Sequence, residues 1–203
     1  MITVTTTPTQ PPPSVSVALT PFGAVLELVD AQGNLTQFDA AGAHFLGSGL
    51  RSASVAFGPF GEVLVTVTTG GVLTQFDAAG VHTLGSSILT ASVAVGPFGE
   101  VLETVTLGGV LTQFDASGAR TLGAGVISTS VAFNGNAFVL EVVTSNGVLT
   151  QFDSTGAHPL LGGVVSAGVA FNSIGTEVLD VIFTNGLLEQ FSSFGIQVVT
   201  KLF

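Results

Sequence analysis

Two series of carboxylates recur at regular spacing along this sequence, and both carry groups that can bind a cation or exchange protons. The first series is Asp39, Asp77, Asp115 and Asp153. The second series is Glu27, Glu103, Glu141 and Asp180, with Val65 at the matching position of one copy. Carboxylate oxygens are the ligands that hard cations prefer, and two carboxyl groups at one site shift each other's pKa.

The first series is better interpreted as a set of turn residues. An Asp side chain accepts a hydrogen bond from the backbone two residues on, which favours Asp at the start of a turn. A glycine closes each of these segments, at positions 42, 80, 118 and 156, and a fifth follows at 195. We therefore expect the aspartates to cap turns rather than to bind metal, and no metal site is predicted.

The second series needs a partner if it is buried. The chain has only three basic residues, which are Arg51, Arg120 and Lys201. Either the series is exposed to solvent, or its carboxylates meet hydroxyls, amides or a cation. We favour an exposed sheet edge, and keep Glu27, Glu103, Glu141 and Asp180 as candidate ligand-binding residues.

A glutamine series recurs in every copy of the same pattern: Gln37, Gln75, Gln113, Gln151 and Gln190. These amides either bond neighbouring units together or present five equivalent groups to a ligand. We favour structural bonding, and the five glutamines remain candidate ligand-binding residues.

Three histidines share a further position, where Arg120 and Gln197 stand in the other copies: His44, His82 and His158. This alternation of polar types indicates an outer, solvated strand. A metal site would need adjacent imidazoles, and one histidine per copy does not provide them.

All these series follow from an internal repeat. The string Leu-Thr-Gln-Phe-Asp begins at Leu35, Leu73, Leu111 and Leu149, in steps of 38 residues, and a weaker copy begins at Leu188. We place the repeats at 16–53, 54–91, 92–129, 130–167 and 168–203, within one domain over 15–203. Residues 1–14 form a Thr/Pro-rich leader, in which 2–6 is strand-like and is a candidate clasp for the last repeat.

Each repeat predicts four strands, which in the second copy are 54–57, 62–68, 72–76 and 81–84. Between the second and third strands stand Gln32-Gly33, Gly70-Gly71, Gly108-Gly109, Asn146-Gly147 and Asn185-Gly186. Such pairs favour a two-residue type I′ hairpin, in which both central residues have positive φ.

The middle strands read as nearly continuous apolar runs, such as Val63-Leu64-Val65, which is typical of sheets covered on both faces. A single repeat cannot bury both faces alone and must stack on its neighbours. Small residues such as Ser54 and Ala56 on the first strand would fit the narrow axis of a ring. The sequence therefore predicts an all-β, five-bladed β-propeller of four-stranded blades with a 38-residue repeat. A β-solenoid fits less well, because its coils are usually shorter than 38 residues. A β-trefoil also fits less well, because it has three four-stranded units and this chain has five.

The motif from Gly71 to Gly80, Gly-Val-Leu-Thr-Gln-Phe-Asp-Ala-Ala-Gly, resembles the repeat of bacterial quinoprotein-type propellers. The segment from Ser54 to Gly61 resembles the opening of many bacterial propeller blades. The chain departs from the quinoprotein family by lacking Trp and by having five repeats, so the resemblance implies the fold and no cofactor. Five-bladed lectins of the tachylectin type are similar at the level of fold, but their aromatic sugar platforms have no Trp or Tyr counterpart here.

Composition excludes several classes of function. The net charge of −10 disfavours nucleic acid, since no basic patch can form. The sequence contains no run of about 20 apolar residues, so it predicts no membrane-inserted helix. The absence of cysteine excludes thiolate chemistry.

No HExxH, GxSxG, P-loop or Rossmann fingerprint occurs, so we predict no catalytic residue, no cofactor and no enzymatic activity. We expect a non-enzymatic propeller with a structural, adhesive or protein-binding role, which includes self-association. The leader weakly favours an extracellular or cell-surface location. The alternative is a lectin with several equivalent glycan sites, and a paired-carboxylate glycoside hydrolase is a remote one.

Overall fold

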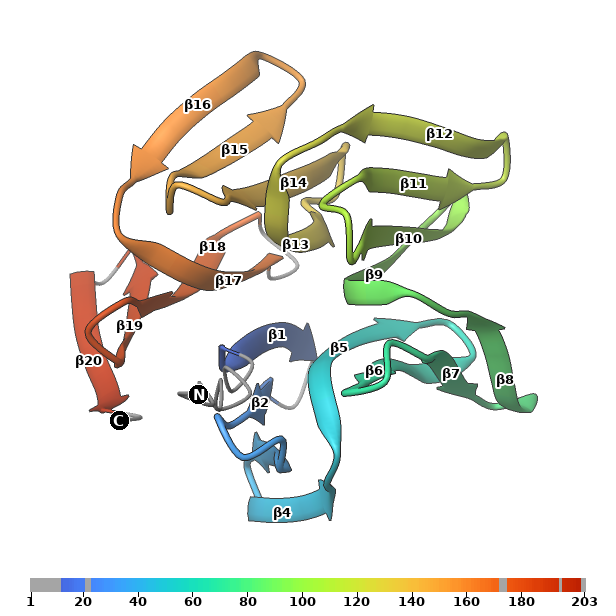
Figure 1. The fold of residues 1–203 in the computed structure, drawn as a ribbon, viewed down its shortest axis with the longest axis horizontal. Helices are drawn as coiled ribbons and strands as arrows, with labels where there is room; N and C mark the ends of the chain where they lie inside the picture. The colour runs from blue at the N-terminus through green and yellow to red at the C-terminus, as the bar shows by residue number, and fades with distance from the viewer. Residues whose placement is uncertain (1–11, 21–22, 172–174, 194, 202–203) are drawn as a thin grey trace, which may run out of the picture.

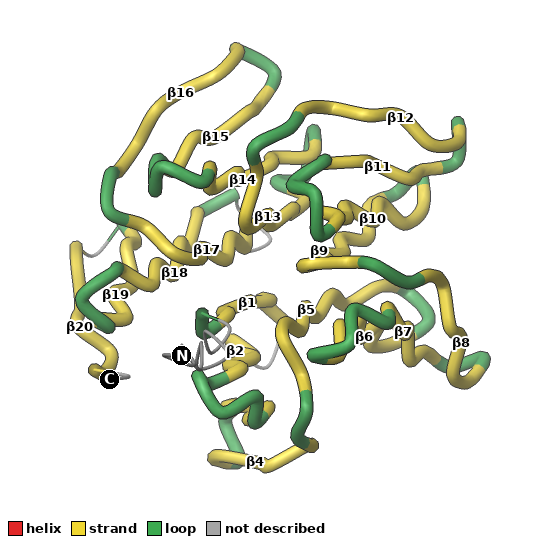
Figure 2. Tube along the Cα trace, in the orientation of Figure 1, coloured by secondary structure: helices red, strands yellow, loops and turns green. Residues whose placement is uncertain are grey.

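The computed structural model describes residues 12–20, 23–171, 175–193 and 195–201, and over these ranges the chain consists of strands joined by short turns (Figures 1 and 2). The strands form five antiparallel sheets, each of four strands in chain order. We number these sheets blade 1 to blade 5. The predicted all-β class and the division of each repeat into four strands are confirmed.

The strands take equivalent places in the five blades. The first strands are β1 (Ser14–Thr20), β5 (Leu50–Gly58), β9 (Ile88–Gly96), β13 (Val126–Phe133) and β17 (Val164–Phe171). The second strands are β2 (Gly23–Val29), β6 (Gly61–Thr68), β10 (Gly99–Thr106), β14 (Phe138–Thr144) and β18 (Glu177–Phe183). The third strands are β3 (Leu35–Asp39), β7 (Leu73–Asp77), β11 (Leu111–Asp115), β15 (Leu149–Asp153) and β19 (Leu187–Ser192). The outer strands are β4 (Gly42–Gly47), β8 (Gly80–Gly85), β12 (Gly118–Gly123), β16 (Gly156–Leu161) and β20 (Gly195–Lys201).

The first strands lie side by side around a common axis, and β1 meets β17, so the ring is closed (Figure 1). The fold is a five-bladed β-propeller, as predicted. The candidate clasp at 2–6 lies outside the described residues. Within the described part of the chain, no helix is long and apolar enough to cross a membrane.

The first strands are longer than predicted. In blade 2 the strand begins at Leu50, four residues before the expected Ser54, and the pairing shifts register between Leu50 and Ser52. This irregularity interrupts the alternation of side chains that makes a strand visible in sequence. The polar Arg51 and Ser52 therefore look like loop residues although they belong to a strand.

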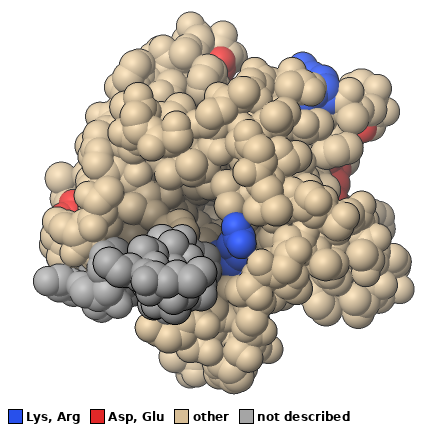
Figure 3. All heavy atoms as spheres, viewed as in Figure 1, with Lys and Arg blue, Asp and Glu red and all other residues tan. Residues whose placement is uncertain are grey.

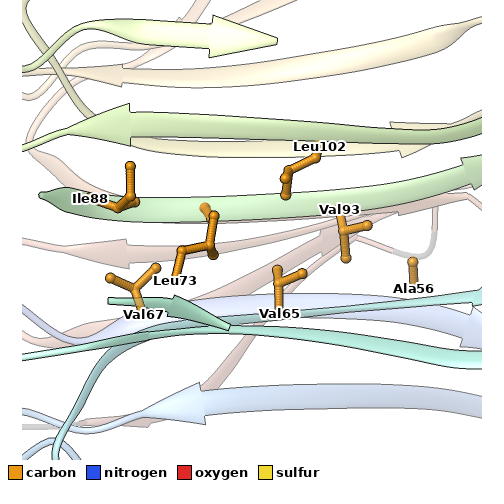
Figure 4. Close-up of a cluster of buried hydrophobic side chains, with 8 residues drawn as sticks. Ala56, Val65, Val67, Leu73, Ile88, Val93 and Leu102 are labelled. Carbon is orange, nitrogen blue, oxygen red and sulfur yellow. The ribbon is translucent and has the colours of Figure 1, made fainter. Parts of the chain in front are cut away.

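The hydrophobic core is divided among the spaces between adjacent blades. In one of these clusters, Val65, Val67 and Leu73 from blade 2 pack against Ile88 and Val93 from blade 3 (Figure 4). The predicted covering of both faces of each sheet is thus achieved by its two neighbours.

The hairpin between the second and third strands differs from the predicted type I′ turn. Positive φ occurs only at its last glycine, which is Gly33, Gly71, Gly109, Gly147 or Gly186. In blade 2, the N–H of Gly71 donates to Thr68 O at 2.8 Å and the N–H of Thr68 donates to Val72 O at 3.0 Å. This is a three-residue loop that ends in a left-handed glycine, so the type I′ prediction was wrong.

These glycines also dock each blade onto the next. The N–H of Leu50 donates to Gly33 O at 3.1 Å, and Ile88 and Val126 repeat this bond to Gly71 and Gly109. A Cβ on Gly33 would lie 2.7 Å from Leu50 O. Glycine is therefore required at this position both for its φ of 80° and for the close approach.

A ladder of serines joins the first strands around the axis. The Oγ of Ser16, Ser54, Ser92 and Ser130 accepts a hydrogen bond from the N–H of the next blade's Val55, Val93, Val131 and Val169, at 3.4, 3.2, 2.9 and 3.0 Å. The small first-strand residues expected from the sequence thus also satisfy backbone donors on the inner edge of each sheet.

Blade 5 closes the ring differently, because Gly168 replaces the serine. A Cβ on Gly168 would lie 3.0 Å from the Cα of Ser16 and 3.1 Å from Val15 O, so the two strands approach too closely for a side chain. The N–H of Val15 donates instead to the Oγ of Ser166 at 3.3 Å.

This geometry predicts that completing the serine ladder will destabilise the protein. Gly168→Ser adds a hydroxyl that the repeat pattern would favour, but it overpacks the closing contact between β17 and β1, and we expect a loss of about 1–3 kcal/mol of unfolding free energy. Urea denaturation followed by circular dichroism measures this.

The matched control is Gly85→Ser, at a glycine with open space around its Cβ. We expect it to change stability by about 0.5 kcal/mol or less. A Gly168→Ser protein as stable as the parent would contradict this account of ring closure.

Candidate functional site

The recurring polar residues form a single row across each blade. In blade 3, Ser92 lies opposite Glu103, Glu103 opposite Gln113, and Gln113 opposite Arg120. Side chains that lie directly opposite on antiparallel strands share one face of the sheet. The serine, acidic, glutamine and histidine positions are therefore one four-residue row, which we call the polar row.

The acidic members of the polar row are buried. Glu27, Glu103, Glu141 and Asp180 are between 0 and 1% exposed. The expectation of an exposed sheet edge was wrong for this series. The reason is that the polar row faces the next blade: Leu64 of blade 2 packs against the clusters that contain Val25 and Val29, on either side of Glu27.

Amides partner these carboxyls in three blades. Gln37 Nε2 donates to Glu27 Oε1 at 2.8 Å, Gln151 Nε2 donates to Glu141 Oε1 at 2.8 Å, and Gln190 Nε2 donates to Asp180 Oδ1 at 3.0 Å. The second oxygen of each carboxyl is buried without a hydrogen-bond partner among the described residues. The predicted candidate residues Glu27, Glu141, Asp180 and their glutamines are thus brought together in pairs.

Burial raises the pKa of each carboxyl in the polar row, because the charged form loses its hydration. The pKa reaches about 7 for Glu27, about 8 for Glu103 and Glu141, and about 6 for Asp180. Hydrogen bonds from glutamine oppose this rise at Glu27, Glu141 and Asp180. Near neutral pH, the row therefore holds protons that exposed carboxyls would have released.

The glutamines also bridge blades. Gln75 Nε2 donates to Glu100 Oε2 of blade 3 at 3.3 Å, and Gln151 Nε2 donates to Glu177 Oε1 of blade 5 at 3.1 Å. The Gln37 amide of blade 1 opposes the rise that burial causes in the pKa of Glu62 of blade 2. Gln75 and Gln151 therefore act between the blades, which leaves their amides little freedom to meet a ligand.

The aspartates of the turns lie where the sequence predicted them. The N–H groups of Ala41, Ala79, Ser117 and Thr155 donate to Asp39, Asp77, Asp115 and Asp153 at 2.7–2.8 Å. His44, His82 and His158 lie 3.3–3.5 Å from the aspartate of their own blade. No group of three metal-ligating side chains exists among the described residues.

Two neighbouring grooves open at the end of the blades where the first strand turns into the second. The groove between blades 1 and 2 has a volume of about 520 Å³ and is lined by Gln37, Asp39 and Glu62 among others. The groove between blades 2 and 3 has a volume of about 300 Å³ and is lined by Glu62, Asp77 and Glu100. We call these two the acidic grooves, and neither has a Lys or Arg in its lining.

Two aromatic side chains project beside the acidic grooves. Phe60 and Phe98, from the turns of blades 2 and 3, are 89% and 82% exposed. Aromatic residues are enriched in protein interfaces relative to the rest of the surface.

Figure 3 views the ring from one side, where acidic side chains appear only singly and near the rim.

Blade 3 departs from the common pattern of the row. Here Gln113 donates to Asp115 at 2.9 Å and its Oε1 accepts from Arg120 at 2.7 Å, so it does not bond Glu103. The sequence showed that Arg120 replaces the histidine of other blades. It did not show that this replacement leaves the buried carboxyl of Glu103 without a glutamine donor.

No protein-family model and no curated protein sequence matches the chain. Among solved structures, 747 chains match. A crystal structure of BBS1N in complex with ARL6DN, soaked with mercury, has 15% identity and a TM-score of 0.48, over 89% of this chain and 67% of that one. The same complex soaked with lead has 12% identity and a TM-score of 0.49, over 86% and 64%. The resemblance to quinoprotein-type repeats stays a prediction.

The buried carboxyls predict that the protein becomes less stable as pH rises. Their pKa values of about 6 to 8 lie above those of the unfolded chain, so between about pH 5 and pH 8 the folded state binds more protons. The free energy of unfolding then decreases with pH, and we expect a thermal midpoint several degrees lower at pH 8 than at pH 5. Calorimetry across this range measures it.

Glu141→Gln removes one of these protons and should make the pH dependence shallower. Glu189→Gln, on β19 outside the polar row, is the matched control and should leave the slope as it is. A midpoint that rises between pH 5 and pH 8 would contradict the assignment.

Proposed function

We propose that this propeller is a non-enzymatic protein-binding module that holds a basic, partly apolar segment of a partner protein at the acidic grooves. The observation that carries the proposal is the pairing of two adjacent grooves lined by carboxyls with two exposed phenylalanines. A structural or adhesive role would use the same surface.

Charge complementarity favours a basic segment. Glu62 lines both grooves, and burial raises its pKa and that of Glu100, so both carboxylates would gain from a nearby cation. A Lys or Arg side chain of the partner would supply the positive charge that the groove linings lack.

Apolar contact supplies the rest of the binding energy. Phe60 and Phe98 contribute little to the propeller core, because most of each side chain is exposed. Aromatic residues on a surface commonly become the central contacts of a protein interface. They stand at equivalent turns of adjacent blades, which suits an extended segment that crosses from one groove to the next.

Support for the glycan-binding alternative at the recurring residues is weaker. Gln37, Gln151 and Gln190 are bonded to buried carboxyls of their own blades. A sugar at these positions would have to replace hydrogen bonds that hold the blades together. We therefore place the binding function at the acidic grooves.

An array of synthetic peptides tests the proposal. Peptides of matched apolar content but basic, neutral or acidic charge are exposed to the purified protein at low and moderate salt. We expect the basic set to bind, with an affinity that falls as ionic strength rises. Equal binding of the acidic and basic sets would refute the proposal.

Two variants locate the surface. Phe60→Ser combined with Phe98→Ser should weaken binding of the selected peptides by about tenfold or more, because each aromatic contact is worth at least 1 kcal/mol at an interface centre. Phe45→Ser is the matched control, at a phenylalanine 67% exposed on the outer strand β4. Equal losses in the control would place binding elsewhere.

A further inference from the structure

A separate pocket lies between blades 3 and 4. It has a volume of about 480 Å³, which is within the range of about 300–1,000 Å³ common for small-molecule sites. Its walls are mostly apolar and include Leu122, Val126, Phe138, Leu140, Val142 and Phe152. It shares no lining residue with the acidic grooves, and so it is independent of the proposed protein-binding surface.

The pocket coincides with two exceptions in the repeat. Near the start of the second strand, blades 2, 3 and 5 carry Glu62, Glu100 and Glu177, and blade 1 has Ala24. Glu100 and Glu177 accept a hydrogen bond from the glutamine of the preceding blade. Blade 4 has Phe138 there, and its ring packs on Phe133 with centroids 5.2 Å apart. The amide–carboxyl bridge is therefore missing at this join.

Arg120 is the second exception. It takes the place that histidine has in blades 1, 2 and 4, and its guanidinium donates to Gln113 Oε1 at 2.7 Å. Gln113 is thereby turned toward Arg120 and Asp115. Unlike Glu27 and Glu141, Glu103 has no glutamine donor.

Glu103 lines the pocket with a buried polar atom. Its side chain is 1% exposed, and its Oε2 has no hydrogen-bond partner in the described part of the chain. Leaving such an atom unpaired costs free energy, so a ligand group that bonds it gains that free energy on binding. The pocket therefore combines apolar walls with one unsatisfied polar group.

The charges around Glu103 determine which head group fits. Arg120 is the one cation in the pocket lining, and its charge acts on Glu103. Burial raises the pKa of Glu103 to about 8, so at neutral pH its carboxyl is mainly protonated and can donate. Asp115 bonds Ser117 and Gln113 and feels the charge of Arg120, and Asp153 of blade 4 bonds Thr155.

We propose that the pocket between blades 3 and 4 binds a small monocarboxylate with an apolar body, whose carboxylate accepts hydrogen bonds from Arg120 and Glu103. The apolar body lies against Phe138, Leu140 and Val142 of β14. The Arg120 guanidinium forms a charge-assisted hydrogen bond with a carboxylate, whereas it would repel an amine and would bond an alcohol more weakly.

Isothermal titration with octanoate, octan-1-ol and octylamine at pH 7 tests the head group with one common tail. We expect octanoate to bind at a single site, and at least about tenfold more tightly than the other two. Tighter binding of octylamine or octan-1-ol, or no detectable binding of octanoate at millimolar concentration, would overturn the proposal.

Two variants introduce residues that other blades carry at these positions and should keep the fold. Arg120→His removes the permanent cation, and Phe138→Glu replaces an apolar wall of the pocket with the carboxyl that blades 2, 3 and 5 carry. Each should weaken octanoate binding by about tenfold or more. Arg51→Gln, at an arginine that bonds Thr69 O outside the pocket, is the matched control. An equal loss in this control would place the octanoate elsewhere on the protein.

The role of Glu103 has a readout of its own. Octanoate stays ionised from pH 6.5 to pH 9, while Glu103 loses its proton near pH 8, so affinity should fall across this range. Glu103→Gln keeps a donor and should abolish the pH dependence while it preserves binding at pH 7. An affinity independent of pH in the parent protein would exclude the assigned contact.

Discussion

Every blade has to bury a row of polar side chains against the apolar face of its neighbour, and the architecture depends on how that row is satisfied. In the middle of the joins, Glu27, Glu103 and Glu141 are almost completely covered. Protonation lowers the cost of burying the carboxyls, and glutamine amides supply one hydrogen bond to most of them. The low charge of the chain is consistent with this solution, since few cations are available for the acids.

The strand pattern and the ring could be predicted from the sequence, because both follow from a repeat whose units have two apolar faces. The pairing of acids with glutamines was missed for a specific reason. A two-residue hairpin at Gln32-Gly33 would place Glu27 opposite Phe38, whereas the three-residue loop places it opposite Gln37. A difference of one residue in the length of the loop therefore hid the fact that the acidic series and the glutamine series lie opposite each other.

Burial of the acidic series was missed for a related reason. Apolar residues surround each acid along its strand, which fits both an exposed edge and a covered sheet. The residues opposite each acid on the adjacent strands distinguish the exposed from the buried arrangement. Gln37 can bond Glu27 only if both side chains point into the same join between blades. The roles of the turn aspartates depend on contacts within a few residues, so sequence alone was sufficient to predict them.

The join between blades 3 and 4 shows why a repeat can diverge at one place and keep its fold. Each blade contacts only its two neighbours, so a change at one join leaves the other four as they were. Phe138 removes the carboxyl that would bond Gln113, and Arg120 then engages that glutamine instead. With both changes present, Gln113 bonds Arg120 and Asp115, and Glu103 is left without a glutamine donor at a place where a pocket adjoins it.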